Sequence, residues 1–230
     1  MIKSVSILPA ISSTLGSNFH GSPVKFASPN LLELTELYKS ARTEPWELTS
    51  HDYWWRTIDN FSIGSEFSLS LEQLARQGAG SNGRTLSFLV DQGVAQMATN
   101  LLPFFQHLVI KCGDLGVLLA MRFPADDPTA WAGERSDTRR RQIITHGKAE
   151  IIVIKHYPAH TIEPQYAVNV TGAGDSLVGA LLAALVQNPS TFSNPESLDD
   201  VIELGQSAAI ETLRSPLAVS PSLSIKYMNR

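Results

Sequence analysis

The sequence predicts an α/β fold with a largely parallel sheet, and three features of its pattern support this. Short apolar runs, each about as long as one strand, recur along the 230 residues. Longer stretches with apolar residues at helical spacing separate these runs. The strand candidates are mostly hydrophobic throughout rather than alternating, which is typical of parallel sheets with both faces covered.

The first predicted elements are a strand and a helix. Residues 1–22 mix Ser, Gly and Asn with short apolar groups, and we expect them to be partly irregular. Val24–Ala27 alternates as a strand does. Apolar residues between 31 and 38 fall on one helical face, and Asn30 with Glu33 has the spacing of a capping box. Asn30 and Glu33 can therefore have a purely structural role as a helix cap, and this interpretation remains open together with a functional role.

Two less regular regions interrupt this pattern. Residues 41–84 carry three of the four tryptophans, so we expect an insertion that packs on the body of the protein. Within it, the glycine-rich stretch 78–83 lacks the lysine of a phosphate-binding P-loop and is predicted to be a flexible loop. Residues 124–148 are rich in Pro, Asp and Arg, and we predict a surface loop or a second insertion there.

The remaining predicted elements continue the alternation. A helix is predicted over 85–102 and a β-branched strand over 108–111. A glycine turn leads from that strand into a second one over 117–120. Further along, we predict a buried strand at 151–154 and an amphipathic helix at 198–213.

One stretch carries the clearest functional signal. Residues 169–176 read Asn-Val-Thr-Gly-Ala-Gly-Asp-Ser and lead into the apolar run 177–186. Residues 167–168 are predicted to end a strand, which puts the glycines on a strand-to-helix turn. Backbone N–H groups at a helix N-terminus attract anions, and glycine lets a ligand approach closely. The residues alone leave two interpretations open: an anion site with Asp175 at its mouth, or a tight turn with Asp175 as helix N-cap.

Composition narrows the class of protein. The 18 basic and 22 acidic residues give a net charge of −4, which argues against a nucleic-acid binder with a basic surface. The basic run 139–141 is expected in a solvated loop. A single cysteine, Cys112, excludes an internal disulfide framework and fits a reducing compartment. No apolar stretch reaches transmembrane length and residues 1–5 lack a signal-peptide core, so we expect a cytoplasmic enzyme or binding protein without membrane contact.

Three motifs in one order resemble the signatures of the ribokinase-like (PfkB) sugar and nucleoside kinases. Residues 30–33, Asn-Leu-Leu-Glu, match an Asn-x-x-Glu motif. Residues 111–116 are similar to a Lys-x-Gly-x-x-Gly turn, and 169–175 resemble the second family signature. The Asn-Val-Thr variant and the tail 218–224 are most similar to the pseudouridine kinase branch, which in some eukaryotes is fused to a pseudouridine-5′-phosphate glycosidase. The resemblance implies a three-layer α/β/α fold with a mostly parallel sheet.

The resemblance also implies catalytic roles. Asp175 would be the base that takes the proton from a sugar or nucleoside hydroxyl as that hydroxyl attacks the γ-phosphate of ATP. The backbone amides of Gly172, Ala173 and Gly174 would form an anion hole for the charge that develops.

Nucleotide and metal contacts follow from the same resemblance. Asn30 and Glu33 would order Mg²⁺ and its waters near the phosphates, with Glu33 acting through water. Asn169 stands near a monovalent-cation site where many members have Asp, so activation by K⁺ is left open. The other implied nucleotide-binding residues are Lys111, Gly113, Gly116, Thr171 and Ala208.

The sequence departs from the family at its N-terminal side. The family's early strands and lid, which bind the sugar, precede the Asn-x-x-Glu motif, whereas here Asn30 lies near the first residue. The chain contains no Gly-Gly pair, although the first family signature relies on one. We therefore expect residues 1–230 to form the C-terminal portion of one kinase domain, with the N-terminal part and lid missing. A partner chain or a missing N-terminal segment would complete the site.

Two functions from different classes remain open. The chain is either an ATP-dependent kinase of a sugar or nucleoside, or a truncated, inactive kinase lobe that binds nucleotide or a partner. We expect nucleotide binding near Asp175 with little kinase activity from this chain alone. A serine hydrolase centred on Ser207 is excluded, because an α/β-hydrolase needs a later His and the last one is His160. A zinc hydrolase is excluded because no His-Glu-x-x-His spacing occurs.

Overall fold

The computed structural model describes residues 6–15, 21–78, 84–126 and 128–223. The signal-peptide, glycine-loop and tail predictions therefore fall, wholly or in part, outside the described residues. The chain divides into two compact units, Met1–Pro128 with Ala132–Pro158, and Thr129–Trp131 with Ala159–Arg230. The single domain expected over 1–230 remains a prediction.

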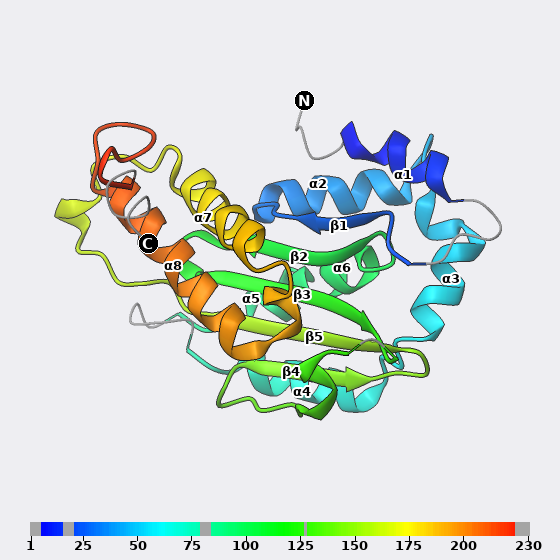
Figure 1. Ribbon diagram of the computed structural model, residues 1–230. Helices are drawn as coiled ribbons and strands as arrows, with labels where there is room; N and C mark the ends of the chain where they lie inside the picture. The colour runs from blue at the N-terminus through cyan, green and yellow to red at the C-terminus, as the bar shows by residue number, and fades with distance from the viewer. Residues whose placement is uncertain (1–5, 16–20, 79–83, 127, 224–230) are drawn as a thin grey trace. The chain divides into compact units, whose positions relative to one another are not determined.

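The first unit contains a five-stranded sheet in the order β1-β2-β3-β5-β4 (Figure 1). The first strand pairs in parallel with the second, whereas the other three neighbouring pairs are antiparallel. The strands are β1 (Val24–Ala27), β2 (Phe105–Lys111), β3 (Val117–Pro124), β4 (Gln142–His146) and β5 (Glu150–Tyr157).

The α/β class is confirmed, but the expectation of a mostly parallel sheet is wrong for this chain. Strands β2 and β3 are joined by residues 112–116, and β4 and β5 by residues 147–149. Connections this short can only reverse the chain, because a parallel crossover needs a dozen or more residues. Turn length therefore decides strand direction here, although the strands are as hydrophobic as those of a parallel sheet.

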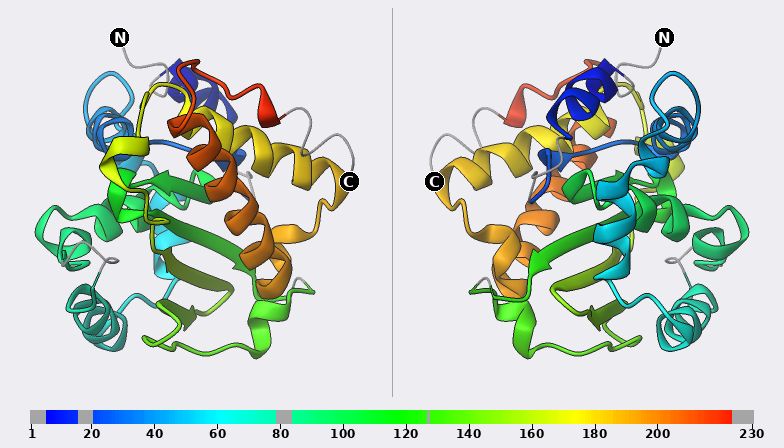
Figure 2. Two further views of the ribbon diagram at one scale, coloured as in Figure 1. Left: turned by 90° about the vertical axis from the view of Figure 1, so that its left-hand side faces the viewer. Right: turned by 90° about the vertical axis from the view of Figure 1, so that its right-hand side faces the viewer.

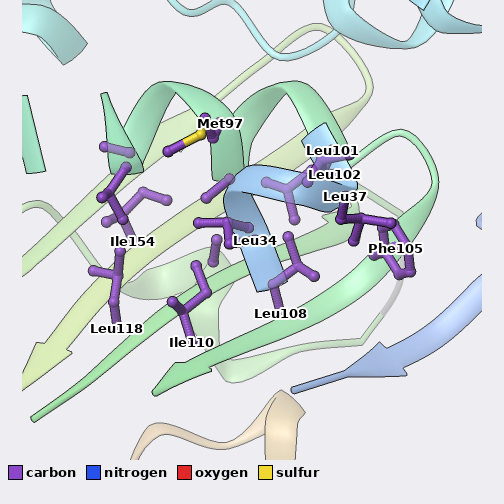
Figure 3. Packing of buried hydrophobic residues seen from close by; sticks show 14 of the residues in the cluster. Leu34, Leu37, Met97, Leu101, Leu102, Phe105, Leu108, Ile110, Leu118 and Ile154 are labelled. Carbon is purple, nitrogen blue, oxygen red and sulfur yellow. The ribbon is translucent and has the colours of Figure 1, made fainter. Parts of the chain in front are cut away.

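The second, fourth, fifth and sixth helices of the first unit lie on one face of this sheet (Figure 2). Figure 3 shows Leu34 and Leu37 of the second helix and Leu101 of the sixth pointing toward Leu108 and Ile110 of β2. Removing these apolar side chains from water is the main force that holds this layer to the sheet. The helices are α1 (Leu8–Thr14), α2 (Leu31–Arg42), α3 (Asp52–Asp59), α4 (Ser65–Ala75), α5 (Phe88–Asp91) and α6 (Val94–Leu101).

The described residues between 41 and 78 pack into this core, as predicted for this region. Leu48, Tyr53, Phe61 and Phe67 are buried, and the Tyr53 hydroxyl donates to the carbonyl of Pro103 at 2.7 Å. Whether the region is an insertion relative to other proteins stays a prediction.

The stretch expected to be partly irregular contains one helix, α1. Two local predictions are corrected. The helix predicted over 85–102 is divided into α5 and α6, because Gly93 adopts a φ of 65° that ends regular helix. The region 124–148 includes strand β4, whose Ile143 and Ile144 are buried, so it is not only a surface loop.

The second unit is built on two helices, α7 (Ala173–Gln187) and α8 (Pro195–Leu213), which pack against each other. They approach so closely that a Cβ atom on Gly205 would lie 2.6 Å from Cδ1 of Leu181. At one end, the buried Trp131 donates from Nε1 to the carbonyl of Phe192 at 2.7 Å.

The strand predicted to end at 167–168 does not form. Residues 158–172 contain only a single 3-10 turn, Pro164–Tyr166. The amides of Val168 and Asn169 instead donate to the carbonyl of Leu213, at 2.8 and 3.2 Å. The glycine turn is therefore held to the end of α8 rather than to a sheet. Among the described helices, none has both the length and the hydropathy needed to cross a bilayer.

Candidate functional site

In the first unit, Asn30 and Glu33 form the predicted capping box at the start of α2. Oδ1 of Asn30 accepts from the Glu33 amide at 2.8 Å, and Oε2 of Glu33 accepts from the Asn30 amide at 2.8 Å. Asn30 is exposed and Glu33 is half-buried. The structural interpretation of this pair is confirmed, and each side chain commits one oxygen to it.

The strand end at Lys111 lies next to this cap. Asn30 and Lys111 form an isolated parallel bridge, and the Lys111 amide donates to the carbonyl of Pro29 at 2.9 Å. The turn that follows includes Gly113 at a φ of 62° and Gly116 at a φ of 96°. A Cβ atom on Gly113 would meet no atom within 4 Å. The fold thus brings Asn30, Glu33 and the predicted nucleotide-contacting turn together within the first unit.

In the second unit, the glycine turn opens directly into α7. Gly172 is the N-cap at a φ of 83°, and no side chain caps the helix. The amides of the first helical turn, those of Ala173, Gly174 and Asp175, have no partner within the helix. They are therefore donors that an anion can use, and the helix dipole favours negative charge at this end.

Asp175 is not the N-cap, so that alternative is wrong. It is the third residue of α7, and its side chain is exposed. Within the described ranges, no hydrogen bond or ion pair engages its carboxylate. The carboxylate consequently lies beside uncapped amides and is available to a proton donor from outside.

The segment after α8 folds over this turn. A Cβ atom on Gly172 would lie 1.7 Å from the carbonyl oxygen of Ala218. Nδ2 of Asn169 donates to the carbonyl of Pro216 at 3.3 Å, while its Oδ1 accepts from the Thr171 amide at 2.9 Å. Glycine at 172 is thus required by the protein's own backbone, whatever ligand binds there.

A cavity of about 730 Å³ runs along α7 and α8. Its volume is in the range of small-molecule sites. Two of the residues singled out from the sequence, Asp175 and Ala208, line it together. The other lining residues are Ser176, Gly179, Ala180, Ala183, Ala184, Gln187, Asn188, Thr191, Ser197, Asp200, Val201, Leu204, Val219 and Leu223.

The sequence predicts metal binding by isolated side chains, Glu33 for Mg²⁺ and Asn169 for a monovalent cation, rather than by a cluster of ligands. In the part of the chain that the structure describes, no group of three or more His, Cys, Asp or Glu residues could hold a metal ion. Mg²⁺ in phosphoryl-transfer sites commonly uses one or two carboxylates and takes its other ligands from phosphates and water. Glu33 in the first unit and Asp175 in the second are each a carboxylate of that donor type, and metal binding by either residue stays a prediction.

Comparison with known proteins finds a family similarity over the C-terminal part of the chain. A family profile described as pfkB family carbohydrate kinase matches residues 125–225. The predicted resemblance is confirmed. The matched region contains Asn169, the glycine turn and Asp175.

Individual relatives are distant. A pseudouridine-metabolizing bifunctional protein of Schizosaccharomyces pombe is 26% identical over 200 residues, which are 87% of this chain and 23% of that protein. The ribokinase of Thermotoga maritima aligns over 91% of this chain and 58% of its own, at 16% identity and a TM-score of 0.35. The ribokinase of Giardia lamblia aligns over 89% of this chain and 59% of its own chain, at 10% identity and a TM-score of 0.40. The chain thus spans about a quarter of its curated relative.

Sequence reasoning missed the residues that hold these turns. The carbonyl group of Ala218 packs against Gly172. Because it is a backbone group, the residue type at position 218 does not indicate this contact. His156 contacts the carbonyl of Leu115, 41 positions away, across the fold. The cavity along α7 has a weak signal in the small residues at 179, 180, 183 and 184, which the helical period places near one another.

Proposed function

We propose that this chain carries the nucleotide-binding and catalytic part of an ATP-dependent kinase that phosphorylates a sugar or nucleoside hydroxyl, with a pseudouridine-like nucleoside as acceptor. The observation that carries the proposal is the uncapped first turn of α7, where free amides adjoin the exposed carboxylate of Asp175. The profile match over 125–225 and the name of the relative from Schizosaccharomyces pombe support it.

The amides would act on the charge of the transferred phosphoryl group. Phosphoryl transfer needs reactants held in line and charge stabilised on oxygen, with little covalent chemistry from the protein. The N–H groups of Gly172, Ala173 and Gly174 would donate to the phosphoryl oxygens. Because they belong to a helix terminus, they are already oriented and need not reorganise during the reaction.

Asp175 would accept the proton of the attacking hydroxyl. A carboxylate is a weak base, but in a loose transition state the proton leaves late, so alignment matters more than basicity. Asp175 directly follows Gly174 in the first turn of α7, so its carboxylate and the Gly174 amide belong to the same turn. Attack, proton removal and charge stabilisation would therefore occur on one helical turn.

Within the first unit, the resemblance suggests nucleotide and metal contacts of its own. Mg²⁺, when bound, neutralises phosphate charge. Asn30 and Glu33 would orient its waters, using the oxygen of Glu33 that the capping box leaves over. Lys111, Gly113 and Gly116 would present backbone to the nucleotide, and K⁺ near Asn169 remains part of the proposal.

Calorimetry with Mg·ATP and a radiolabelled transfer assay with pseudouridine test this proposal on the 230-residue chain. We expect saturable Mg·ATP binding by the wild type and by Asp175→Asn. Any transfer to pseudouridine should fall by at least about a hundredfold in Asp175→Asn, because the base is lost. Glu196→Gln is the matched control, since Glu196 is the first-turn carboxylate of α8.

The outcomes separate the two candidate functions. Mg·ATP binding without transfer to any sugar or nucleoside would replace the kinase with the inactive, nucleotide-binding lobe. Failure to bind Mg·ATP or Mg·ADP at all would overturn the kinase and the nucleotide-binding lobe, and would leave an inactive lobe that binds a partner. Equal loss of transfer in Glu196→Gln and Asp175→Asn would remove the base role from Asp175.

A further inference from the structure

A buried histidine reaches the turn at residues 113–116 from a distant strand. His156 lies near the end of β5, with 2% of its surface exposed. Its Nε2 is 2.6 Å from the carbonyl oxygen of Leu115, the last residue of the 3-10 turn Gly113–Leu115. Leu115 is itself buried, so its carbonyl depends on a protein partner rather than on bulk water.

The second ring nitrogen of His156 determines which nitrogen carries the proton. Nη1 of Arg141 lies 3.3 Å from Nδ1. A guanidinium group can only donate, so Nδ1 accepts. A neutral imidazole with an accepting Nδ1 has its proton on Nε2, and this is the nitrogen that faces the Leu115 carbonyl. Both contacts therefore require the same tautomer, and each supports the other.

Arg141 is held in place by the backbone next to it. It adopts a φ of 55°, and its amide donates to the carbonyl of Thr138 at 3.0 Å. Its own carbonyl accepts from the His156 amide at 3.0 Å. The arginine is thus fixed to the same residue whose ring it orients.

Burial keeps the ring neutral. The pKa of His156 is lowered to about 4, mainly by desolvation and also by the charge of Arg141, against the raising effect of the Leu115 hydrogen bond. At neutral pH the lone pair on Nδ1 is consequently available to Arg141, and the Nε2 proton to Leu115.

The contacts inside the turn are local. The Cys112 amide donates to the Gly116 carbonyl at 2.8 Å, and the Gly116 amide donates to the Gly113 carbonyl at 3.1 Å. From outside the turn, Arg84 pairs with Asp114 at 2.6 Å, but both side chains are more than half exposed, where ion pairs contribute little. Two glycines at positive φ give this turn wide conformational freedom.

We propose that His156, oriented by Arg141, is a positioning residue that fixes the turn at 113–116 in the conformation that accepts the nucleotide. The inference rests on the proposed function, because it assigns a purpose to a turn assumed to contact ATP. It goes beyond that proposal by adding Arg141, which directly precedes β4, and His156 of β5. Their effect is on nucleotide affinity through the Leu115 carbonyl.

Three variants test the inference. His156→Leu removes both hydrogen bonds, whereas His156→Gln keeps an N–H donor at a similar reach for Leu115 and an oxygen for Arg141. The matched control is His107→Leu, which removes another buried histidine of the same sheet, near the start of β2 and away from the turn. Each protein is assayed for Mg·ADP affinity by calorimetry and for amide hydrogen exchange at residues 114–116, at a temperature where it is fully folded.

We expect His156→Leu to raise the Mg·ADP dissociation constant about tenfold, the effect of one lost hydrogen bond to a buried group. Exchange at residues 114–116 should accelerate in the same variant. His156→Gln should restore most of both properties, and His107→Leu should leave both near wild type.

The results separate this inference from the proposed function. If the wild type binds Mg·ADP and His156→Leu binds it within twofold, or if His107→Leu weakens binding equally, the positioning role is wrong. If the wild type does not bind nucleotide, the proposed function fails. Exchange at residues 114–116 then decides by itself whether His156 holds the turn.

Discussion

Glycine at position 172 is required by the backbone conformation and packing of the fold, and it is also part of the proposed anion site. Its φ of 83° lies in the left-handed region, and the Ala218 carbonyl occupies the place of a Cβ atom. The glycine motif is therefore no proof of an anion site by itself. What favours the anion site is the absence of a side-chain cap on α7, combined with the exposed carboxylate of Asp175.

Gly172→Ala should destabilise the protein by at least about 2 kcal/mol, because the left-handed conformation penalises a Cβ atom and the Ala218 backbone must move. Gly179→Ala is the control on the same helix. A Cβ atom there meets no atom within 4 Å, and alanine should stabilise the helix by about 1 kcal/mol. Urea unfolding followed by circular dichroism measures both. Equal effects of the two substitutions would contradict the close approach of Ala218.

Candidate site residues could be predicted from the sequence where their side chains belong to a motif. Contacts between segments that are distant in the sequence could not be predicted. Asn30, Glu33 and Asp175 each carry a side chain whose type and spacing indicate a role. Ala218 acts through its carbonyl, and His156 acts on a residue 41 positions away, so neither leaves a pattern in a local window. Such residues emerge only when the fold brings distant segments together.

At the scale of elements, capping and turn length proved more informative than hydrophobicity. The capping box at α2 was predicted from two residues and is present. Strand direction was not predicted correctly, because a strand buried on both faces has the same apolar pattern in parallel and antiparallel sheets. The five-residue connection at 112–116 was the usable signal, since it is too short for a parallel crossover.

Asn30→Ala should cost about 1 kcal/mol of stability, because the Glu33 amide loses its acceptor. Asn194→Ala is the matched control, since Asn194 caps α8 by accepting from the Ser197 amide at 3.0 Å. Both variants should unfold at lower urea concentration by similar amounts. If Asn30 also orients Mg²⁺, only Asn30→Ala should weaken Mg·ADP binding. Equal affinities in the two variants would leave Asn30 as a helix cap alone.

For the molecule as a whole, the α/β class was predicted correctly, whereas the division into two compact units was not predicted. The single domain over 1–230 stays a prediction. Hydropathy reports which residues are buried but not which of them share a core. The boundary near residue 158 also has no composition change that would mark a linker. The profile match over 125–225 crosses this boundary, so similarity to a family does not mark it either.

Two buried histidines should make the stability of the whole molecule depend on pH. Burial lowers the pKa of His107 to about 3 and that of His156 to about 4, from an ordinary value of 6.5. The unfolded chain therefore binds more protons than the folded one below pH 6.5. The stability that these residues contribute is complete above that pH and is lost as the pH falls from 6.5 toward about 4 for His156 and toward about 3 for His107.

The expected loss from His156 alone approaches about 3 kcal/mol at the acid end of this window, at about 1.4 kcal/mol per pKa unit. Urea unfolding at about pH 7 and about pH 5 measures it, with His156→Gln as the comparison. Carboxylates common to both proteins cancel in the difference. The variant should lose less stability than the wild type between the two pH values, because glutamine does not titrate. Parallel curves for the two proteins would mean that folding does not lower the pKa of His156, which would contradict a ring kept neutral by burial beside Arg141.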